Sequence, residues 1–148
     1  MASTYQSLHY HLVFSTRNRA RYIEAAWRSH LHNYLGGTIR GLGGFPEGIG
    51  GVDDHVHLLV GLKAAHRIAD IVQELKKASN RWVHEEIGIR EFAWQGGYAV
   101  FTVSDSKRDV VKRYIANQER HHRTISYDEE IVTMLEKSGI IYDPRYLR

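Results

Sequence analysis

The sequence predicts an α+β fold of the split βαβ type, folded as one domain over residues 1–148. Three observations support this prediction. Strand-like and helix-like segments follow one another in the order β-α-β-β-α-β, two further helical segments come after them, and no repeat or linker interrupts the chain. A chain of 148 residues can bury roughly 68–70% of the surface that its unfolded form exposes. It therefore needs neither disulfides nor a structural metal to fold.

The first half of the chain contains three predicted strands and one helix. Residues 8–15 are apolar, aromatic and β-branched, which is typical of a buried strand. A helix is predicted over residues 24–40, ending among glycines. A weak strand over 45–52 and a central strand over 55–61 follow, and they are joined by a tight turn.

The second half begins with the strongest helical pattern, over residues 66–87, and a strand over 98–103. We expect a helix over 106–122, with Ser106 as its N-cap, and a last helix that starts at the capping box Ser126-x-x-Glu129 and reaches Ser138. This order is that of ferredoxin-like and RRM-like domains. In such a sandwich the first and third strands are adjacent at the centre of an antiparallel sheet, helices cover one face, and the C-terminal helices are additional.

The composition excludes several classes of function. The chain has no Cys, which rules out disulfides, cysteine-ligated zinc, iron–sulfur clusters and thiol nucleophiles, but it has 10 His. The Gly-Lys-Ser/Thr of a phosphate-binding loop and the Gly-x-Ser-x-Gly of a serine hydrolase do not occur. We expect a soluble, cytoplasmic protein with no membrane partner, because we find no signal peptide and no apolar run of about 18 residues.

The charge pattern permits a polyanionic partner. Lys and Arg number 20 against 17 Asp and Glu, for a net charge of +3. Two basic groups could contact a nucleic-acid backbone, although an ordinary solvated surface explains them equally well. They are Arg17, Arg19 and Arg21 after the first strand, and Lys76, Lys77 and Arg81 on the central helix.

His55 and His57 form the most informative pair. Side chains at i and i+2 of a strand point to the same face, so the two imidazoles can share one divalent ion. Two ligands leave most of the coordination sphere open to water and substrate, as in a catalytic centre. The alternative is a pair of half-exposed histidines that bind no ion.

Two neighbouring patterns are weaker. His9 and His11 have the same spacing, and in the predicted sheet they could lie beside the strand of His55, although a structural role is the simpler explanation. Asp53 and Asp54 could be acid/base groups or metal ligands, but a hairpin turn accounts for them more simply.

The helix predicted over 106–122 carries a second constellation. At 100° per residue, Tyr114, Gln118 and His121 fall together at the edge of its buried stripe. Gln118 can lend an amide oxygen to an ion held by the histidines. A tyrosine hydroxyl, with an ordinary pKa near 10, is a poor nucleophile unless a cation or a base stabilises the phenolate. Taken alone, Tyr114 reads as a residue at the core edge.

Three stretches together resemble the single-tyrosine HUH transposases, the small transposases of insertion sequences and their relatives associated with repetitive extragenic palindromes. The stretches are DHVHLLV at 54–60, the strand at 98–103 and YIANQERHH at 114–122. The similarity extends from HLVFSTRNR near the start to YDPRYL at the end. It rests on the order and spacing of the parts, since each motif alone is weak.

The resemblance implies a metal-dependent DNA transposase. His55 and His57, with Gln118, would hold Mg²⁺ or Mn²⁺ against the scissile phosphate, and Tyr114 would attack single-stranded DNA to form a 5′-phosphotyrosine link. Asn117 and His121 are auxiliary candidates. The implied partners are hairpin-containing single-stranded ends of the element and a second copy of the chain. Whether the tyrosine serves its own chain or its partner is left open.

Two alternatives belong to other classes of protein. A non-catalytic RRM-like module would bind single-stranded nucleic acid without a divalent ion. A two-histidine phosphodiesterase would use water in place of Tyr114, but it would need a second His-x-Ser/Thr pair where this chain has His9-Tyr-His11.

Overall fold

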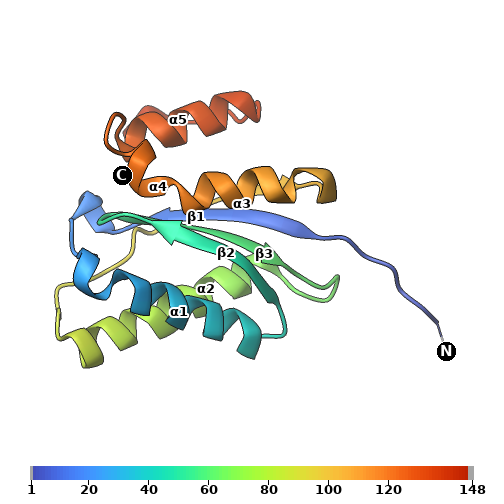
Figure 1. Ribbon diagram of the computed structural model, residues 1–148, viewed down its shortest axis with the longest axis horizontal. Helices are drawn as coiled ribbons and strands as arrows, with labels where there is room; N and C mark the ends of the chain where they lie inside the picture. Colours follow the sequence, from blue (N-terminus) through green and yellow to red (C-terminus); the bar gives the residue numbers. More distant parts are fainter. Residues whose placement is uncertain (1, 147–148) are drawn as a thin grey trace.

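The computed structural model describes residues 2–146 and has one four-stranded antiparallel sheet. Its strands are β1 (His9–Ser15), β2 (Phe45–Gly51), β3 (His55–Gly61) and β4 (Ala99–Val103). Their order in the sheet is β2-β3-β1-β4. The first and third strands are therefore adjacent at the centre, as the sequence predicts (Figure 1).

Helices α1 (Ala25–Gly41) and α2 (Ile68–Trp82) cover one face of the sheet (Figure 1). The helix predicted over 66–87 is shorter than expected and continues as a π-helical turn, Val83–Ile87. Between this helical layer and the sheet lies the main apolar core, because alternate strand residues point toward the helices. The core residues from the sheet include Leu12, Phe14, Val56, Leu58 and Val60.

The opposite face of the sheet is covered by α3 (Arg108–Ala116), α4 (Gln118–His121) and α5 (Tyr127–Lys137), as Figure 1 shows. Two small apolar clusters attach them. Ile115 packs on Leu59 and Val103, and α5 packs on Val13. The predicted C-terminal helices thus form a second layer, under which the other set of strand side chains is buried.

The prediction of a single helix over residues 106–122 is wrong in two respects. The chain first makes a 3-10 turn, Asp105–Lys107, and the Ser106 hydroxyl contacts the Ser104 hydroxyl instead of capping α3. The helix then breaks at Asn117, which has φ −100° and ψ 19°. Gln118 therefore begins a short separate helix, α4, and does not continue the helix of Tyr114.

Two local features shape the C-terminal layer: the capping box at the start of α5 and the close approach of α3 to β2. The predicted capping box is confirmed, because the Ser126 side chain accepts from the Glu129 backbone and the Glu129 side chain accepts from the Ser126 backbone. Gly50 lets α3 lie very close to β2, since a Cβ built there would be 2.2 Å from the Ile115 carbonyl oxygen. Any larger residue would force the two backbones apart.

We expect Gly50→Ala to lower the free energy of unfolding by about 1–3 kcal/mol, because it overpacks the contact between β2 and α3. Gly37→Ala is the matched control. A Cβ at Gly37 meets nothing within 4 Å inside α1, and the change should stabilise the protein by about 0.5–1 kcal/mol. Urea unfolding followed by circular dichroism measures both. Equal stabilities of the two variants would contradict the close approach.

Candidate functional site

His55 and His57 lie on the face of β3 that α3, α4 and α5 cover. Both side chains are fully buried, which excludes the half-exposed pair considered from the sequence. The neighbouring strand adds His11, whose Nε2 is 2.7 Å from His57 Nδ1. His9 lies elsewhere, with its Nδ1 2.9 Å from a carboxylate oxygen of Glu47. Of the first-strand pair, only His11 joins the site.

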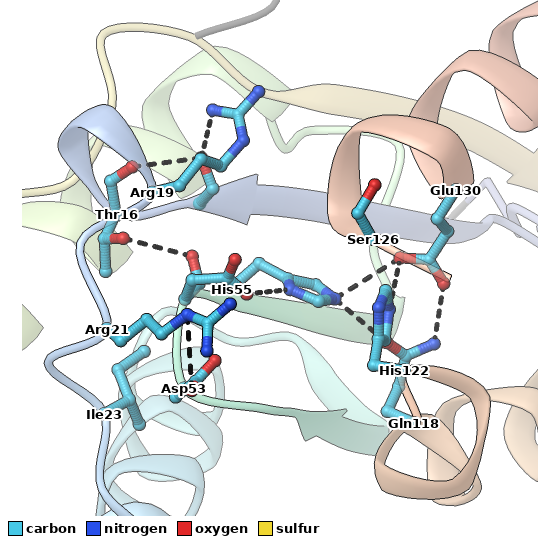
Figure 2. Close-up of polar contacts among 12 residues, drawn as sticks. Thr16, Arg19, Arg21, Ile23, Asp53, His55, Gln118, His122, Ser126 and Glu130 are labelled. Atoms are coloured by element: carbon cyan, nitrogen blue, oxygen red, sulfur yellow. Dashed lines mark hydrogen bonds and ion pairs between the residues drawn. The ribbon is translucent and has the colours of Figure 1, made fainter. Parts of the chain in front are cut away.

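A carboxylate from α5 lies at the centre of this site. Glu130 Oε1 is 3.0 Å from His57 Nε2, 3.0 Å from His122 Nε2 and 3.3 Å from His55 Nε2. The Glu130 residue is only 2% exposed. Figure 2 shows His55 pointing from the sheet and Glu130 pointing from α5 toward the same point.

Sequence reasoning missed Glu130 and His122. A signal for Glu130 was present, because residues at i, i+3, i+4 and i+7 share one helix face. Position 130 falls on the same face of α5 as Tyr127, Ile131 and Met134, and those residues pack on the sheet. A carboxylate in the apolar stripe of an amphipathic helix therefore marks a buried charge that needs partners.

Tyr114 and Gln118 contact the other oxygen of the same carboxylate. The Tyr114 hydroxyl donates to Glu130 Oε2, and Gln118 Nε2 donates to it over 2.9 Å. The amide oxygen of Gln118 is 3.0 Å from His55 Nε2, and His121 Nε2 is 3.4 Å from the Tyr114 hydroxyl. The constellation predicted on the C-terminal helices thus meets the His55–His57 pair within one chain.

Each central histidine is held by its other ring nitrogen. His55 Nδ1 donates to the Asp54 carboxylate over 2.7 Å, and His122 Nδ1 donates to the Ile125 carbonyl over 2.9 Å. The role of Asp54 therefore goes beyond the hairpin turn assumed from the sequence. The ligand atoms of His55, His57, His122 and Glu130 all lie within 4.8 Å of one another, so this group can hold a metal ion.

Burial lowers the pKa of a histidine, whereas a neighbouring carboxylate raises it, and the balance differs among the histidines of the site. Burial lowers the pKa of His57 to about 4 despite its contact with Glu130. Burial also acts to lower the pKa of His55, but hydrogen bonds with Asp54 and Glu130 outweigh it and raise that pKa to about 9. His11 is neutral as well, since burial lowers its pKa to about 3.

The carboxylate and the phenol are affected by the same contacts. Burial alone would raise the pKa of Glu130, yet hydrogen bonds to His122, His55 and His57 hold it well below its usual range. The pKa of Tyr114 is raised above 10, first by burial and then by the Glu130 carboxylate. The site therefore combines a charged carboxylate with a protonated phenol, which is a poor nucleophile unless a cation or a base stabilises the phenolate.

The remaining predicted residues lie away from this centre. Asn117 is exposed at the break between α3 and α4. Lys76 Nζ donates to the carbonyls of Gln95 and Gly97, and Arg19 donates to Asp128 and stacks on Tyr127. These two cations therefore make internal contacts. The other cations predicted to contact DNA are exposed on the surface: Arg17, Arg21, Lys77 and Arg81.

Arg17 and Lys77 come from different parts of the sequence but line one shallow hollow of about 330 Å³, together with Lys76 and Trp94. The first basic segment and the central helix thus form one surface. Among residues 2–146, no helix is both long and apolar enough to cross a membrane.

Comparisons with known proteins agree with this architecture. The family described as "Transposase IS200 like" matches residues 4–118. A protein from Deinococcus radiodurans R1, assigned as a transposase, has a similar structure with a TM-score of 0.63 and 28% identity, covering 80% of this chain and 95% of that one. A comparison with curated proteins found no match.

A second solved structure is a REP-associated tyrosine transposase bound to a REP hairpin. It has a TM-score of 0.61 and 14% identity, and the match covers 84% of this chain and 76% of that one. At this identity the likeness concerns the fold. The α+β fold with a four-stranded antiparallel sheet is therefore similar in the two proteins.

Because Arg19 makes internal contacts and Arg21 does not, substitutions at these two arginines should change the stability of the protein by different amounts. Arg19→Gln removes the hydrogen bonds to Asp128 that anchor α5, and we expect it to lower the free energy of unfolding by about 1–2 kcal/mol. Arg21→Gln removes an exposed charge 4.0 Å from Asp53 and should change stability by less than about 0.5 kcal/mol. Urea unfolding compares them, and equal losses would refute an anchoring role.

Proposed function

Because this chain belongs to the IS200-like transposase family, we propose that it is a metal-dependent transposase that cuts and rejoins single-stranded DNA through Tyr114. One observation carries the proposal. The hydroxyl of Tyr114 donates to the carboxylate that contacts His55 and His57 of the same chain. This contact supports the proposal because it brings the proposed nucleophile beside the proposed metal ligands of the same folded unit.

Three residues are the proposed ligands of the metal ion. His55 and His57, with the amide oxygen of Gln118, would hold the divalent ion, for which Mg²⁺ or Mn²⁺ is the expectation from the family. When bound, the ion offsets the charge that develops on the phosphate under attack. Two observations support this assignment: the Gln118 amide oxygen lies 3.0 Å from His55 Nε2, and His55 and His57 belong to one cluster of possible ligands.

Tyr114 would supply the covalent step. A bond forms between its hydroxyl oxygen and the phosphorus, and the bond from phosphorus to the 3′ oxygen breaks. The product is a 5′-phosphotyrosine link and a free 3′-hydroxyl. The phenol proton passes to a neighbouring acceptor, Glu130 Oε2 or His121 Nε2, and the leaving oxygen gains a proton. Attack by a 3′-hydroxyl on the link reverses these steps, so rejoining needs no external energy source.

Single-stranded ends that contain a hairpin are the proposed DNA partner. The fold neighbour bound to a REP hairpin supports this, and so does the basic surface on which Arg17 and Lys77 lie together. Phosphate contacts of this kind position a nucleic acid without reading its sequence. The homodimer expected from the family stays a prediction, since Tyr114 lies beside the histidines of its own chain.

The Tyr114→Phe variant tests the proposal. We expect the wild-type protein, incubated with Mg²⁺ or Mn²⁺ and single-stranded DNA labelled at its 3′ end, to form an adduct that survives denaturing electrophoresis. Tyr114→Phe should abolish the adduct, because it removes the oxygen that bonds to phosphorus. Tyr98→Phe, at a tyrosine 40% exposed and outside the site, is the matched control and should leave the adduct unchanged.

Other results would identify the other classes of function. An adduct that persists in Tyr114→Phe would move the nucleophile to another residue. Cleavage without an adduct in both proteins would indicate a phosphodiesterase that uses water. Salt-sensitive binding with neither product, unchanged by EDTA, would indicate a nucleic-acid-binding module.

A further inference from the structure

We propose that Glu130 and His122 bind the same ion as His55 and His57, giving a centre of three imidazoles and one carboxylate that selects a transition-metal ion such as Zn²⁺ over Mg²⁺. The inference rests on the metal site of the proposed function and changes its ligand set. Both added residues lie beyond residues 4–118, the part of the chain that matches the family. The C-terminal segment would then complete the centre.

The distances fit a four-coordinate ion. A tetrahedral zinc held about 2.0–2.1 Å from each ligand keeps the ligand atoms about 3.3–3.4 Å apart. Glu130 Oε1 is 3.0, 3.0 and 3.3 Å from the Nε2 atoms of His57, His122 and His55. Small side-chain shifts would bring all four atoms to zinc distances, because they already lie within 4.8 Å of one another.

The hydrogen bonds behind the ligands fix which ring nitrogen of His55 and of His122 faces the centre. A carbonyl and a carboxylate only accept, so His122 Nδ1 donates to Ile125 and His55 Nδ1 donates to Asp54. In a neutral imidazole the Nε2 atom then carries a lone pair. Those lone pairs face the oxygen of Glu130, and that of His55 also faces the amide oxygen of Gln118.

A cation at the centre satisfies this arrangement, because every inward atom would then donate its lone pair to the ion. Metal-bound histidines regularly donate their second ring nitrogen to a carboxylate or a backbone carbonyl, as His55 and His122 do here. The partner of His57 is a third imidazole instead, because its Nδ1 lies 2.7 Å from His11 Nε2 and would donate to it when Nε2 binds the ion. All three imidazoles are thus oriented from behind.

The chemistry of the ligands decides which ion is favoured. Imidazole suits zinc, iron, nickel and copper, whereas magnesium prefers oxygen ligands and keeps several waters. Three nitrogens and one carboxylate oxygen therefore favour zinc-type ions over the magnesium expected from the sequence. A hollow of about 310 Å³, lined by Asp54, His122 and Tyr127 among others, lies beside one of the four proposed ligands.

Titration calorimetry on the EDTA-treated full chain, without DNA, tests the inference. We expect the wild type to bind one Zn²⁺ at least about 100-fold more tightly than Mg²⁺. Glu130→Gln keeps the shape of the side chain and His122→Ala removes the third imidazole. Each should weaken Zn²⁺ binding at least about 10-fold. Glu136→Gln, at an exposed position of α5, is the matched control and should bind as the wild type does.

Co²⁺ gives an independent readout, because its visible absorption is intense when four-coordinate and weak when six-coordinate. The wild type should show the intense spectrum, and the Glu130→Gln and His122→Ala variants should lose it while their circular dichroism reports a folded chain. If Glu130→Gln does not fold, His122→Ala carries the same test.

Zn²⁺ affinity that is unchanged in these variants, or a preference of the wild type for Mg²⁺, would overturn the inference. A wild type that binds no ion would also overturn the inference, because protonated imidazoles would then be the hydrogen-bond donors to the Glu130 carboxylate. In each of these cases an adduct that forms through Tyr114 with Mg²⁺ or Mn²⁺ would leave the proposed function intact. Conversely, tight Zn²⁺ binding without any adduct would support the centre and reject the transposase chemistry.

Discussion

The carboxylate of Glu130, buried among three imidazoles, is the interaction on which the second layer of the structure depends. Burying an ionised carboxylate is costly unless it is paired and hydrogen-bonded. The cost is offset here because both oxygens have several partners, with His57 and His122 on one side and Tyr114 and Gln118 on the other. Each of those partners comes from β3, α3 or the segment after α3. The carboxylate therefore fixes where α5 lies, and α5 in turn encloses the site.

The two faces of the sheet have different roles, because side chains alternate between them along each strand. One face forms the main core, and the other carries the site. On β3, Val56, Leu58 and Val60 face α1 and α2 and form the main core, while His55 and His57 face the C-terminal helices. A change of one residue in register would exchange the two sets, so the main core also fixes the direction of the imidazoles. The strand that carries the two imidazoles is buried on both faces, so packing on each side holds it in place.

The sequence predicts the parts of the site that follow from local periodicity. The spacing of His55 and His57 implies a common face in any strand, and the helical spacing of Tyr114 and Gln118 brings them near each other even though the helix breaks between them. The position of Glu130 depends instead on how α5 packs, 73 residues after His57 in the sequence. Its place in an apolar stripe shows that it is buried, but the stripe carries no information about its partners.

The same contacts explain why a cation matters to Tyr114. Burial and the negative charge of Glu130 keep its phenol protonated, which opposes nucleophilic attack. An ion bound by Glu130 Oε1 would draw the carboxylate's charge toward the histidines and away from the oxygen that contacts the phenol. The ion would also join α5 to β3 directly, because its ligands come from both elements. Metal binding and the packing of the C-terminal helix are then one equilibrium, since either one brings the ligands of the other into place.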